Sequence, residues 1–217
     1  SQVNGLSSIA GAFEDFFFTL EDNGYAVKMP APSSVQLRVT AGDEWFTPYL
    51  WGLKAIDAQG AWDKGATGHG VRVAVLDSGI DSDHIDLVDN LNMDLAASFV
   101  DGELVDELPE GVSNHGTHVA GTIAAADNGI GVIGVAPHAE IVPVKVLSAY
   151  TGSGSSYGVM AGIVYAANID SDVINMSLGS MLPRSYKDET GNYTNWINSV
   201  YLKAYNRATR YANKMGT

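Results

Sequence analysis

Two short stretches of this 217-residue chain combine residue types that can move protons. Asp77 directly follows the apolar run VRVAVL, and His115 opens the glycine-containing stretch HGTHVAG. A carboxylate beside an imidazole makes a general base, because histidine titrates near neutral pH and the acid stabilises its cationic form. Each residue also has a structural interpretation: Asp77 as a turn residue that caps backbone N–H groups, and His115 as a hydrogen-bonded residue at a helix start.

Three other patterns resemble known sites less well. His115 and His118 are three residues apart with no Glu between them, so they lack the H-E-x-x-H arrangement of a zinc site. Residues 129–134, GIGVIG, match the dinucleotide-binding G-x-G-x-x-G, but Val, Ala and Pro follow them rather than a helix. GSSYG around Ser156 matches the nucleophile elbow G-x-S-x-G. That motif needs a preceding strand and a later histidine, whereas SAYTGSG reads as a loop and every histidine precedes Ser156.

The apolar pattern predicts how these residues are positioned. Short β-branched runs, each almost continuously apolar, are typical of strands buried on both faces. Helical periodicity alternates with them, which indicates an α/β fold with a mainly parallel sheet and helices on both faces. The predicted strands are residues 71–76, 141–147 and 172–178, and the predicted helices are residues 115–126, 157–168 and 194–214. In such sheets the active groups gather at the carboxyl ends of the strands, where Asp77 lies.

Composition excludes several partners. The chain has 25 acidic and 12 basic residues, a formal net charge of -13, so we expect no nucleic acid and no anionic membrane partner. No apolar run approaches the roughly 18 residues of a membrane span. Cysteine is absent, which removes disulfide and thiolate chemistry. The acidic balance is compatible with a secreted protein that binds hard cations.

Four motifs in order resemble the subtilisin-like serine proteases: VAVLDSGID, NHGTHVAGTIAA, GVAPHAEIVPVKVL and DVINMSLG. The resemblance covers roughly residues 51–216. It implies a subtilisin-like fold, peptide-bond hydrolysis and an extracellular location. It also implies that Asp77 is the acid of an Asp-His-Ser triad and that His115 is its general base.

The same resemblance implies a clamp for polypeptide substrates. Two backbone segments would hold an extended peptide between them as an added strand. They are Ser153, Gly154 and Ser155 on one side, and Ser177, Leu178 and Gly179 on the other.

A structural Ca²⁺ site is implied as well. HIDL resembles the family's short motif, in which the carboxylate, here Asp86, binds the ion. AADNGIGV resembles its calcium loop, which would add the Asn128 side chain and the carbonyls of Ala126, Ile130 and Val132. Oxygen ligands of this kind suit calcium. The alternative is a glycine-rich turn without an ion.

The two ends of the chain carry further expectations. Helical spacing over residues 7–22 predicts a helix. The resemblance implies a prodomain remnant and linker in residues 1–43, with the first part of a catalytic domain in residues 44–217. The family's nucleophile segment G-T-S-x-A and its A-A-G-N-like oxyanion segment do not occur. Residues 172–178 would also be left as a naked apolar edge.

We therefore expect the catalytic domain to lack its C-terminal part and to be inactive alone. Its expected partners are polypeptide substrates, its own prodomain and the missing part of the domain. Two alternatives stay open: a non-catalytic peptide-binding relative, and a prodomain-like inhibitor or chaperone module.

Overall fold

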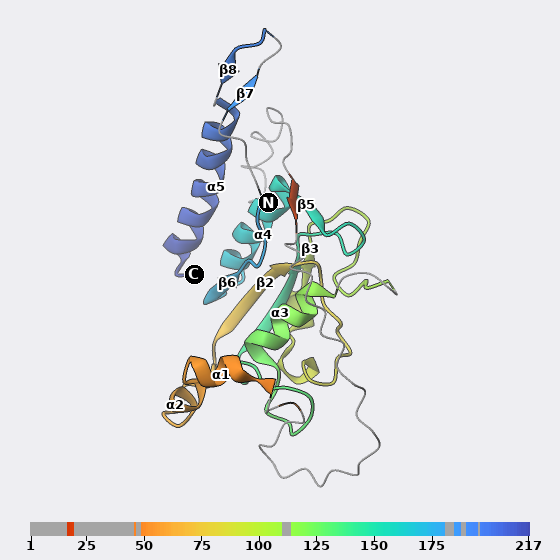
Figure 1. Cartoon of the computed structure of the whole chain (residues 1–217), viewed down its shortest axis with the longest axis vertical. Coiled ribbons are helices and arrows are strands. Elements are labelled where there is room, and N and C mark those ends of the chain that lie inside the picture. The colour runs from red at the N-terminus through yellow and green to blue at the C-terminus, as the bar shows by residue number, and fades with distance from the viewer. Residues whose placement is uncertain are drawn as a thin grey trace.

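The chain folds around a small parallel sheet, which the computed structural model places at the centre of the molecule (Figure 1). The structure describes residues 17–19, 46, 49–109, 114–180, 185–187, 190–194 and 196–217. Most of residues 1–43, where we expect a prodomain and a helix over residues 7–22, therefore lies outside the described residues.

Four strands make up this sheet, in the order β3-β4-β2-β6, and all of their pairings are parallel. Arg72 pairs with Glu140 at one end of the two central strands, and Asp77 pairs with Lys145 at the other end. The carboxyl ends of β2 and β4 therefore meet at one edge of the sheet, where α/β folds place their functional groups. The strands are β2 (Arg72–Asp77), β3 (Ala97–Ser98), β4 (Glu140–Lys145) and β6 (Val173–Asn175).

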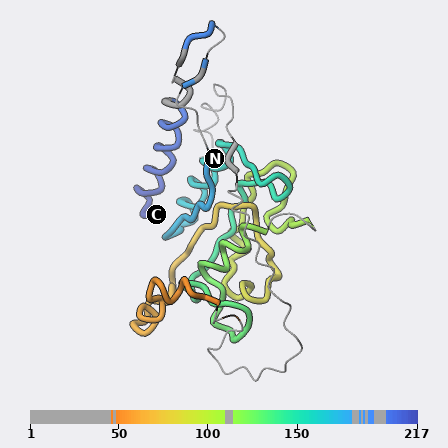
Figure 2. Tube along the Cα trace, in the orientation of Figure 1, coloured from red at the N-terminus to blue at the C-terminus, as the bar shows by residue number. Residues whose placement is uncertain are grey.

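The three predicted helices form close to their expected bounds. α4 opens with a true cap, because the Ser155 hydroxyl accepts a hydrogen bond from the Gly158 N–H. α4 and α5 run beside each other in the tube of Figure 2. The helices are α3 (His115–Ala124), α4 (Ser156–Asn168) and α5 (Trp196–Met215).

Alternate residues of β2 enter two separate cores, one on each face of the sheet. Val73 and Val75 pack in the core that contains Ala120 of α3. Ala74 and Leu76 are completely buried in the other core, which α4 and α5 cover. Successive side chains of a strand point to opposite faces, so a near-continuous apolar run is what a sheet covered on both sides requires. The predicted α/β fold, with helices on both faces, is confirmed.

The third predicted strand is shorter than expected. Only Val173–Asn175 of residues 172–178 pairs with β2, and Val173 is 47% exposed. The other short elements flank the sheet, and the β7–β8 hairpin projects beyond the start of α5 (Figure 1). They are α1 (Trp51–Ala55), α2 (Ala58–Trp62), η4 (Val88–Asn90), η5 (Met93–Leu95), β5 (Ser153–Ser155), β7 (Tyr186–Lys187) and β8 (Tyr193–Thr194).

One prediction for the N-terminal segment is wrong in its described part. Phe17–Thr19, expected within a helix, forms strand β1, which pairs antiparallel with β5. The free edge of β5 offers backbone N–H and C=O groups to a partner strand, and aromatic residues suit strands as well as helices. Non-local pairing therefore overrides the local periodicity. Among the described residues, no helix is both long and apolar enough to cross a membrane.

Candidate active site

Asp77 is held at the carboxyl end of β2, almost out of reach of water. Only 1% of it is exposed. Its Oδ1 accepts a hydrogen bond from the Ser78 N–H at 2.7 Å, and its backbone carbonyl accepts from the N–H groups of Val146 and Leu147. Those last two bonds fix the strand end to the segment that follows β4, while the Ser78 N–H orients the carboxylate.

His115 is the first residue of α3, and its ring meets this carboxylate. Nδ1 lies 2.8 Å from Asp77 Oδ1 and 3.0 Å from Oδ2. The His115 side chain is 28% exposed, so solvent reaches the ring but not the acid behind it. With Nδ1 held against the carboxylate, a proton that the ring takes on its other nitrogen would create a cation that Asp77 stabilises. The pair therefore has the arrangement of a general base and its orienting acid.

Ser78 joins the strand end to the helix start. Its hydroxyl accepts a hydrogen bond from the Gly116 N–H at 3.1 Å, which satisfies one of the unpaired donors of the first helical turn. The fit is close: a Cβ built on Gly116 would lie 2.1 Å from the Gly79 carbonyl oxygen. Only glycine at position 116 lets α3 begin this near to the loop after Asp77.

The two predicted clamp segments lie on different elements. Ser153–Ser155 is strand β5, whose edge is paired with β1 in the register Phe18 to Gly154. Ser177, Leu178 and Gly179 follow β6 after one intervening residue, Met176. A Cβ built on Gly179 meets no atom within 4 Å, so space is open beside that segment.

The argument against a nucleophile elbow needs one correction. The sequence predicts a loop before Ser156, but β5 ends there and α4 begins at Ser156. A strand therefore does precede the helix, because the β1 pairing orders this short segment. The chain order still disagrees with the elbow motif, since its histidine follows the serine. Ser156 is also only 5% exposed.

The predicted calcium residues gather around Asp86. This carboxylate is 3% exposed; its Oδ2 accepts from the Val132 N–H at 2.9 Å, and Oδ1 has no partner. The backbone carbonyl of Asp86 accepts a hydrogen bond from the Ala126 N–H. The Asn128 side-chain amide donates to the Ile85 carbonyl, and its oxygen accepts from the Ile130 N–H. The loop thus wraps around a buried carboxylate.

An unpartnered buried oxygen of this kind fits a hard cation. Burial raises the pKa of the Asp86 carboxyl, and the Val132 N–H, the nearby His84 and Asn128 partly offset that effect. Gly131 lines the same place, because a Cβ there would lie 2.3 Å from Asp86 Oδ2. Across the described ranges, no three His, Cys, Asp or Glu side chains cluster as metal ligands. An ion at Asp86 would therefore depend on carbonyl and amide oxygens.

Sequence reasoning missed Ser78, Glu103 and Lys145. Lys145 is completely buried at the end of β4 and pairs with Glu103 at 3.0 Å. The available signal was a single charged residue inside the apolar run IVPVKVL, since buried lysines are rare unless paired. Nothing comparable in the sequence pointed to Ser78 or Glu103.

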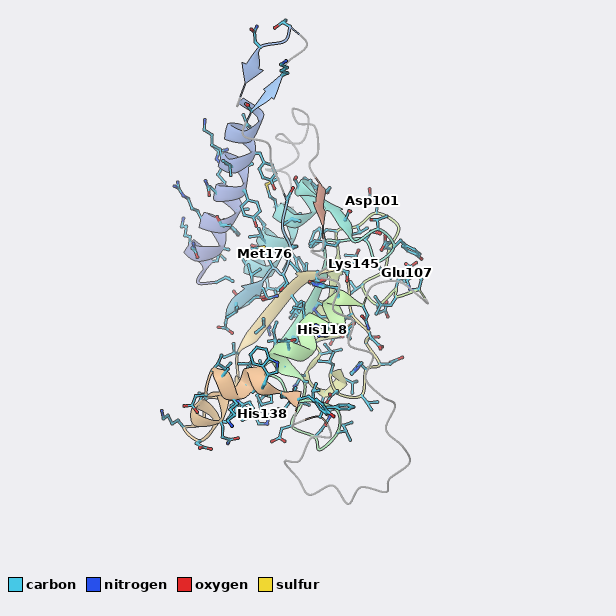
Figure 3. The ribbon with its side chains drawn as sticks, in the orientation of Figure 1. Asp101, Glu107, His118, His138, Lys145 and Met176 are labelled. Carbon is cyan, nitrogen blue, oxygen red and sulfur yellow. The ribbon has the colours of Figure 1, made fainter. Side chains whose placement is uncertain are left out.

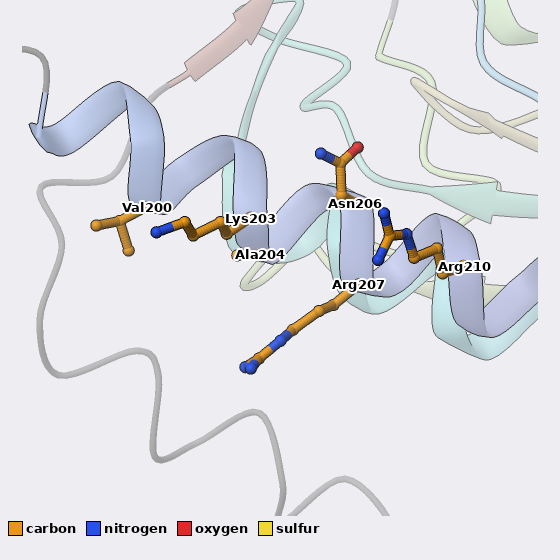
Figure 4. A pocket seen from close by; sticks show the side chains of 6 residues that line it. All are labelled: Val200, Lys203, Ala204, Asn206, Arg207 and Arg210. Atoms are coloured by element: carbon orange, nitrogen blue, oxygen red, sulfur yellow. The ribbon is translucent and has the colours of Figure 1, made fainter.

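A hollow of about 330 Å³ lies along α5 (Figure 4), and neither Asp77 nor His115 lines it. All of its lining residues belong to α5, three of them are basic, and none is acidic. The lining residues are Val200, Lys203, Ala204, Asn206, Arg207 and Arg210.

Comparison with known proteins gives a consistent result. A family model described as "Subtilase family" matches residues 68–214. Subtilisin Savinase of Lederbergia lenta is 49% identical over 142 residues, which are 65% of this chain and 49% of that protein. Alkaline elastase YaB of Bacillus sp. (strain YaB) is 42% identical over 173 residues, 76% of this chain and 43% of that protein.

A solved structure agrees. Fervidolysin from Fervidobacterium pennivorans, described as a keratinolytic enzyme related to subtilisin, matches with a TM-score of 0.60 and 29% identity. That match covers 88% of this chain and 26% of fervidolysin. The chain spans about half or less of these relatives, and 35% of an alkaline protease from Alkalihalobacillus alcalophilus.

Proposed function

Because the chain belongs to the subtilase family, we propose that it carries the acid–base half of a serine endopeptidase site. The observation that supports this most directly is the 2.8 Å contact between Asp77 Oδ1 and His115 Nδ1. In this proposal, His115 takes the proton of an attacking serine hydroxyl and returns it to the leaving amine. Asp77 holds the imidazole in orientation and stabilises its cation.

The serine itself is proposed to come from outside these 217 residues. No G-T-S-x-A segment occurs in the sequence, and neither does the oxyanion asparagine segment. Removing the nucleophile from a triad of this type costs about six orders of magnitude in kcat. A polypeptide of this sequence alone is therefore expected not to hydrolyse peptides measurably.

We propose that β5 and residues 177–179 clamp an extended polypeptide substrate. Support comes from β1, since three residues of the chain itself already pair with the β5 edge. Main-chain pairing of this kind supplies affinity without demanding a particular side chain. The same pairing supports residues 1–43 as a prodomain that occupies the clamp.

We also propose a structural Ca²⁺ at Asp86, Asn128 and the carbonyls of Ala126, Ile130 and Val132. The unpartnered Asp86 Oδ1 supports it, because a bound cation would compensate the cost of burying that oxygen. When bound, the ion would supply charge neutralisation to the loop and take no part in proton transfer. Secretion is proposed from the family alone.

Labelling with a fluorophosphonate probe tests the enzyme proposal. The full-length gene product, folded and loaded with Ca²⁺, is expected to be labelled on serine, and the 217-residue chain is not. His115→Ala in the full-length protein should abolish labelling, whereas the matched variant His118→Ala, on an exposed position of the same helix, should not. A folded full-length protein that resists the probe favours the non-catalytic peptide-binding alternative.

The clamp is tested separately. Phe18→Pro removes a backbone donor from β1 and should release the β5 edge. Faster amide exchange in Ser153–Ser155 and tighter binding of an added extended peptide are expected. Unchanged exchange in β5 would contradict the clamp without affecting the enzyme proposal.

A further inference from the structure

Lys145 is a buried cation that the proposed proton transfer does not use. It is 0% exposed and sits at the carboxyl end of β4, where it is the register partner of Asp77 on β2. Figure 3 labels it at this edge of the sheet. Taking an ammonium group out of water costs several kcal/mol unless its partners compensate. Its contacts therefore indicate what it stabilises.

The first contact is with the backbone next to the triad acid. Lys145 Nζ donates a hydrogen bond to the Ser78 carbonyl oxygen at 2.6 Å. Ser78 makes two further hydrogen bonds within the site. Its N–H donates to Asp77 Oδ1 at 2.7 Å, and its hydroxyl accepts from the Gly116 N–H at 3.1 Å. One residue thus links the ammonium group to both the acid and the helix that carries His115.

The second contact leads to the peptide-binding edge. Lys145 Nζ pairs with Glu103 Oε2 at 3.0 Å, and the same oxygen accepts from the Ala149 N–H at 2.9 Å. Glu103 also bonds Ser148, whose own N–H donates to the carbonyl of Ser153, the first residue of β5. The ion pair therefore touches the segment that carries β5.

We propose that the Lys145–Glu103 ion pair positions the site: Lys145 fixes Ser78 and so the Asp77–His115 hydrogen bond, while Glu103 fixes the segment that leads into β5. Neither residue touches the reacting atoms. The catalytic meaning of this ion pair rests on the proposed function, but the geometry that it controls exists in the chain without substrate. The bond from Lys145 to the Ser78 carbonyl and the bond from Ala149 to Glu103 each involve a charged group. Such charge-assisted hydrogen bonds are shorter and stronger than bonds between neutral groups.

The test follows the hydrogen between His115 Nδ1 and Asp77 by proton NMR on the whole chain, at fixed pH. Lys145→Met removes the donor to Ser78 at similar side-chain length. We expect exchange of this hydrogen with water to become about tenfold faster, as loss of one supporting charged hydrogen bond implies. Glu103→Gln should accelerate exchange of the Ala149 amide proton more than that of the His115 proton.

A matched control lies at the other end of the same two strands. Arg72 pairs with Glu140 there, as neighbours in the same β2–β4 ladder. Arg72→Met should lower thermal stability without changing exchange of the His115 proton. Equal acceleration in the Arg72 and Lys145 variants would reduce Lys145 to a general stabilising role and overturn the proposal.

Lys145→Met leaves the largely desolvated Glu103 carboxylate, 11% exposed, without its cationic partner, which alone could prevent folding. The double variant Lys145→Met/Glu103→Leu removes both charges and keeps the site apolar. It should fold and still show faster exchange of the His115 proton, because Ser78 has lost its donor. An unchanged proton in the double variant also overturns the proposal. Probe labelling of the full-length protein, which tests the protease itself, is read independently of either result.

Discussion

His115 Nδ1 faces both carboxylate oxygens of Asp77, at 2.8 and 3.0 Å, and the acid behind the ring is 1% exposed. Burying a carboxylate away from water costs free energy unless strong hydrogen-bond donors replace its hydration. Here the Ser78 N–H and the ring supply them. The acid is therefore tied to one tautomer of His115, in which the proton on Nδ1 points to Asp77 and the other ring nitrogen can act as base.

Asp77→Asn should preserve the shape of this contact and remove its function. An amide NH₂ at this position favours the opposite tautomer, and a change of this kind in a serine protease triad lowers kcat about 10⁴-fold. We expect a loss of that order in kcat, with KM nearly unchanged, in peptide hydrolysis by the full-length protein. Asp83→Asn, at an exposed position, is the control and should retain full activity. Comparable losses in the two variants would contradict the role assigned to Asp77.

Gly116→Ala should disturb both the site and the fold. The added Cβ would lie 2.1 Å from the Gly79 carbonyl oxygen and 3.2 Å from the Asp77 Cβ, so the start of α3 must move away. Forcing a side chain into a filled place typically costs about 1–3 kcal/mol. At this chain length that corresponds to a Tm lower by roughly 2–4 °C per kcal/mol, measured by thermal unfolding.

Gly121 supplies the matched control on the same helix. A Cβ built there meets no atom within 4 Å, so Gly121→Ala brings only the better helix propensity of alanine. That propensity is worth up to about 1 kcal/mol. We expect a Tm equal to or above that of the parent chain. If both variants lost the same stability, close packing at Gly116 would not be the reason.

The sequence predicted what local patterns encode. A near-continuous apolar run, VRVAVL, requires burial on both faces, and β2 indeed divides its residues between two cores. The position of Asp77 follows directly, since it comes after that run at the carboxyl end of the strand. The helical pattern that starts at residue 115 predicts His115 at a helix start, and α3 begins there.

What the sequence could not predict depends on contacts between distant segments. Phe17–Thr19 has helical spacing in its neighbourhood but pairs with an edge more than a hundred residues away. The role of Ser78 is equally hidden, because its three hydrogen bonds are made to groups that only the fold brings together. Local propensity carries no information on such pairings.

Calcium should stabilise the chain through Asp86. An ion that binds only the folded state at 100 times its Kd adds about 2.7 kcal/mol to the free energy of unfolding. We therefore expect a Tm rise with Ca²⁺ that EDTA reverses and that Asp86→Asn abolishes. Asp89→Asn, exposed on η4, should keep the full rise. A Ca²⁺ effect that survives Asp86→Asn would place the ion elsewhere.

The ion pair at Glu103 predicts a dependence of stability on pH. Burial, the largest single influence, raises the pKa of this carboxyl, but hydrogen bonds from Ser148, Ala149 and Lys145 together lower it below its ordinary value. A pKa lowered in the folded state means that Glu103 stabilises the fold above its unfolded pKa. That contribution is lost as pH falls through the folded pKa. Glu103→Gln should therefore flatten the fall in the free energy of unfolding on the acid side, measured by urea denaturation.

Asp86 should affect the pH dependence of stability in the opposite direction to Glu103, in the same measurement with EDTA present to remove calcium. Its pKa is raised by burial, so its contribution is present below the unfolded pKa and is lost as pH rises through the folded pKa. Asp86→Asn should remove the loss in free energy of unfolding that occurs as pH rises. Glu103→Gln should remove the loss that occurs as pH falls. If the two variants changed the pH dependence in the same direction, one of these carboxylates would not have the environment that the structure gives it.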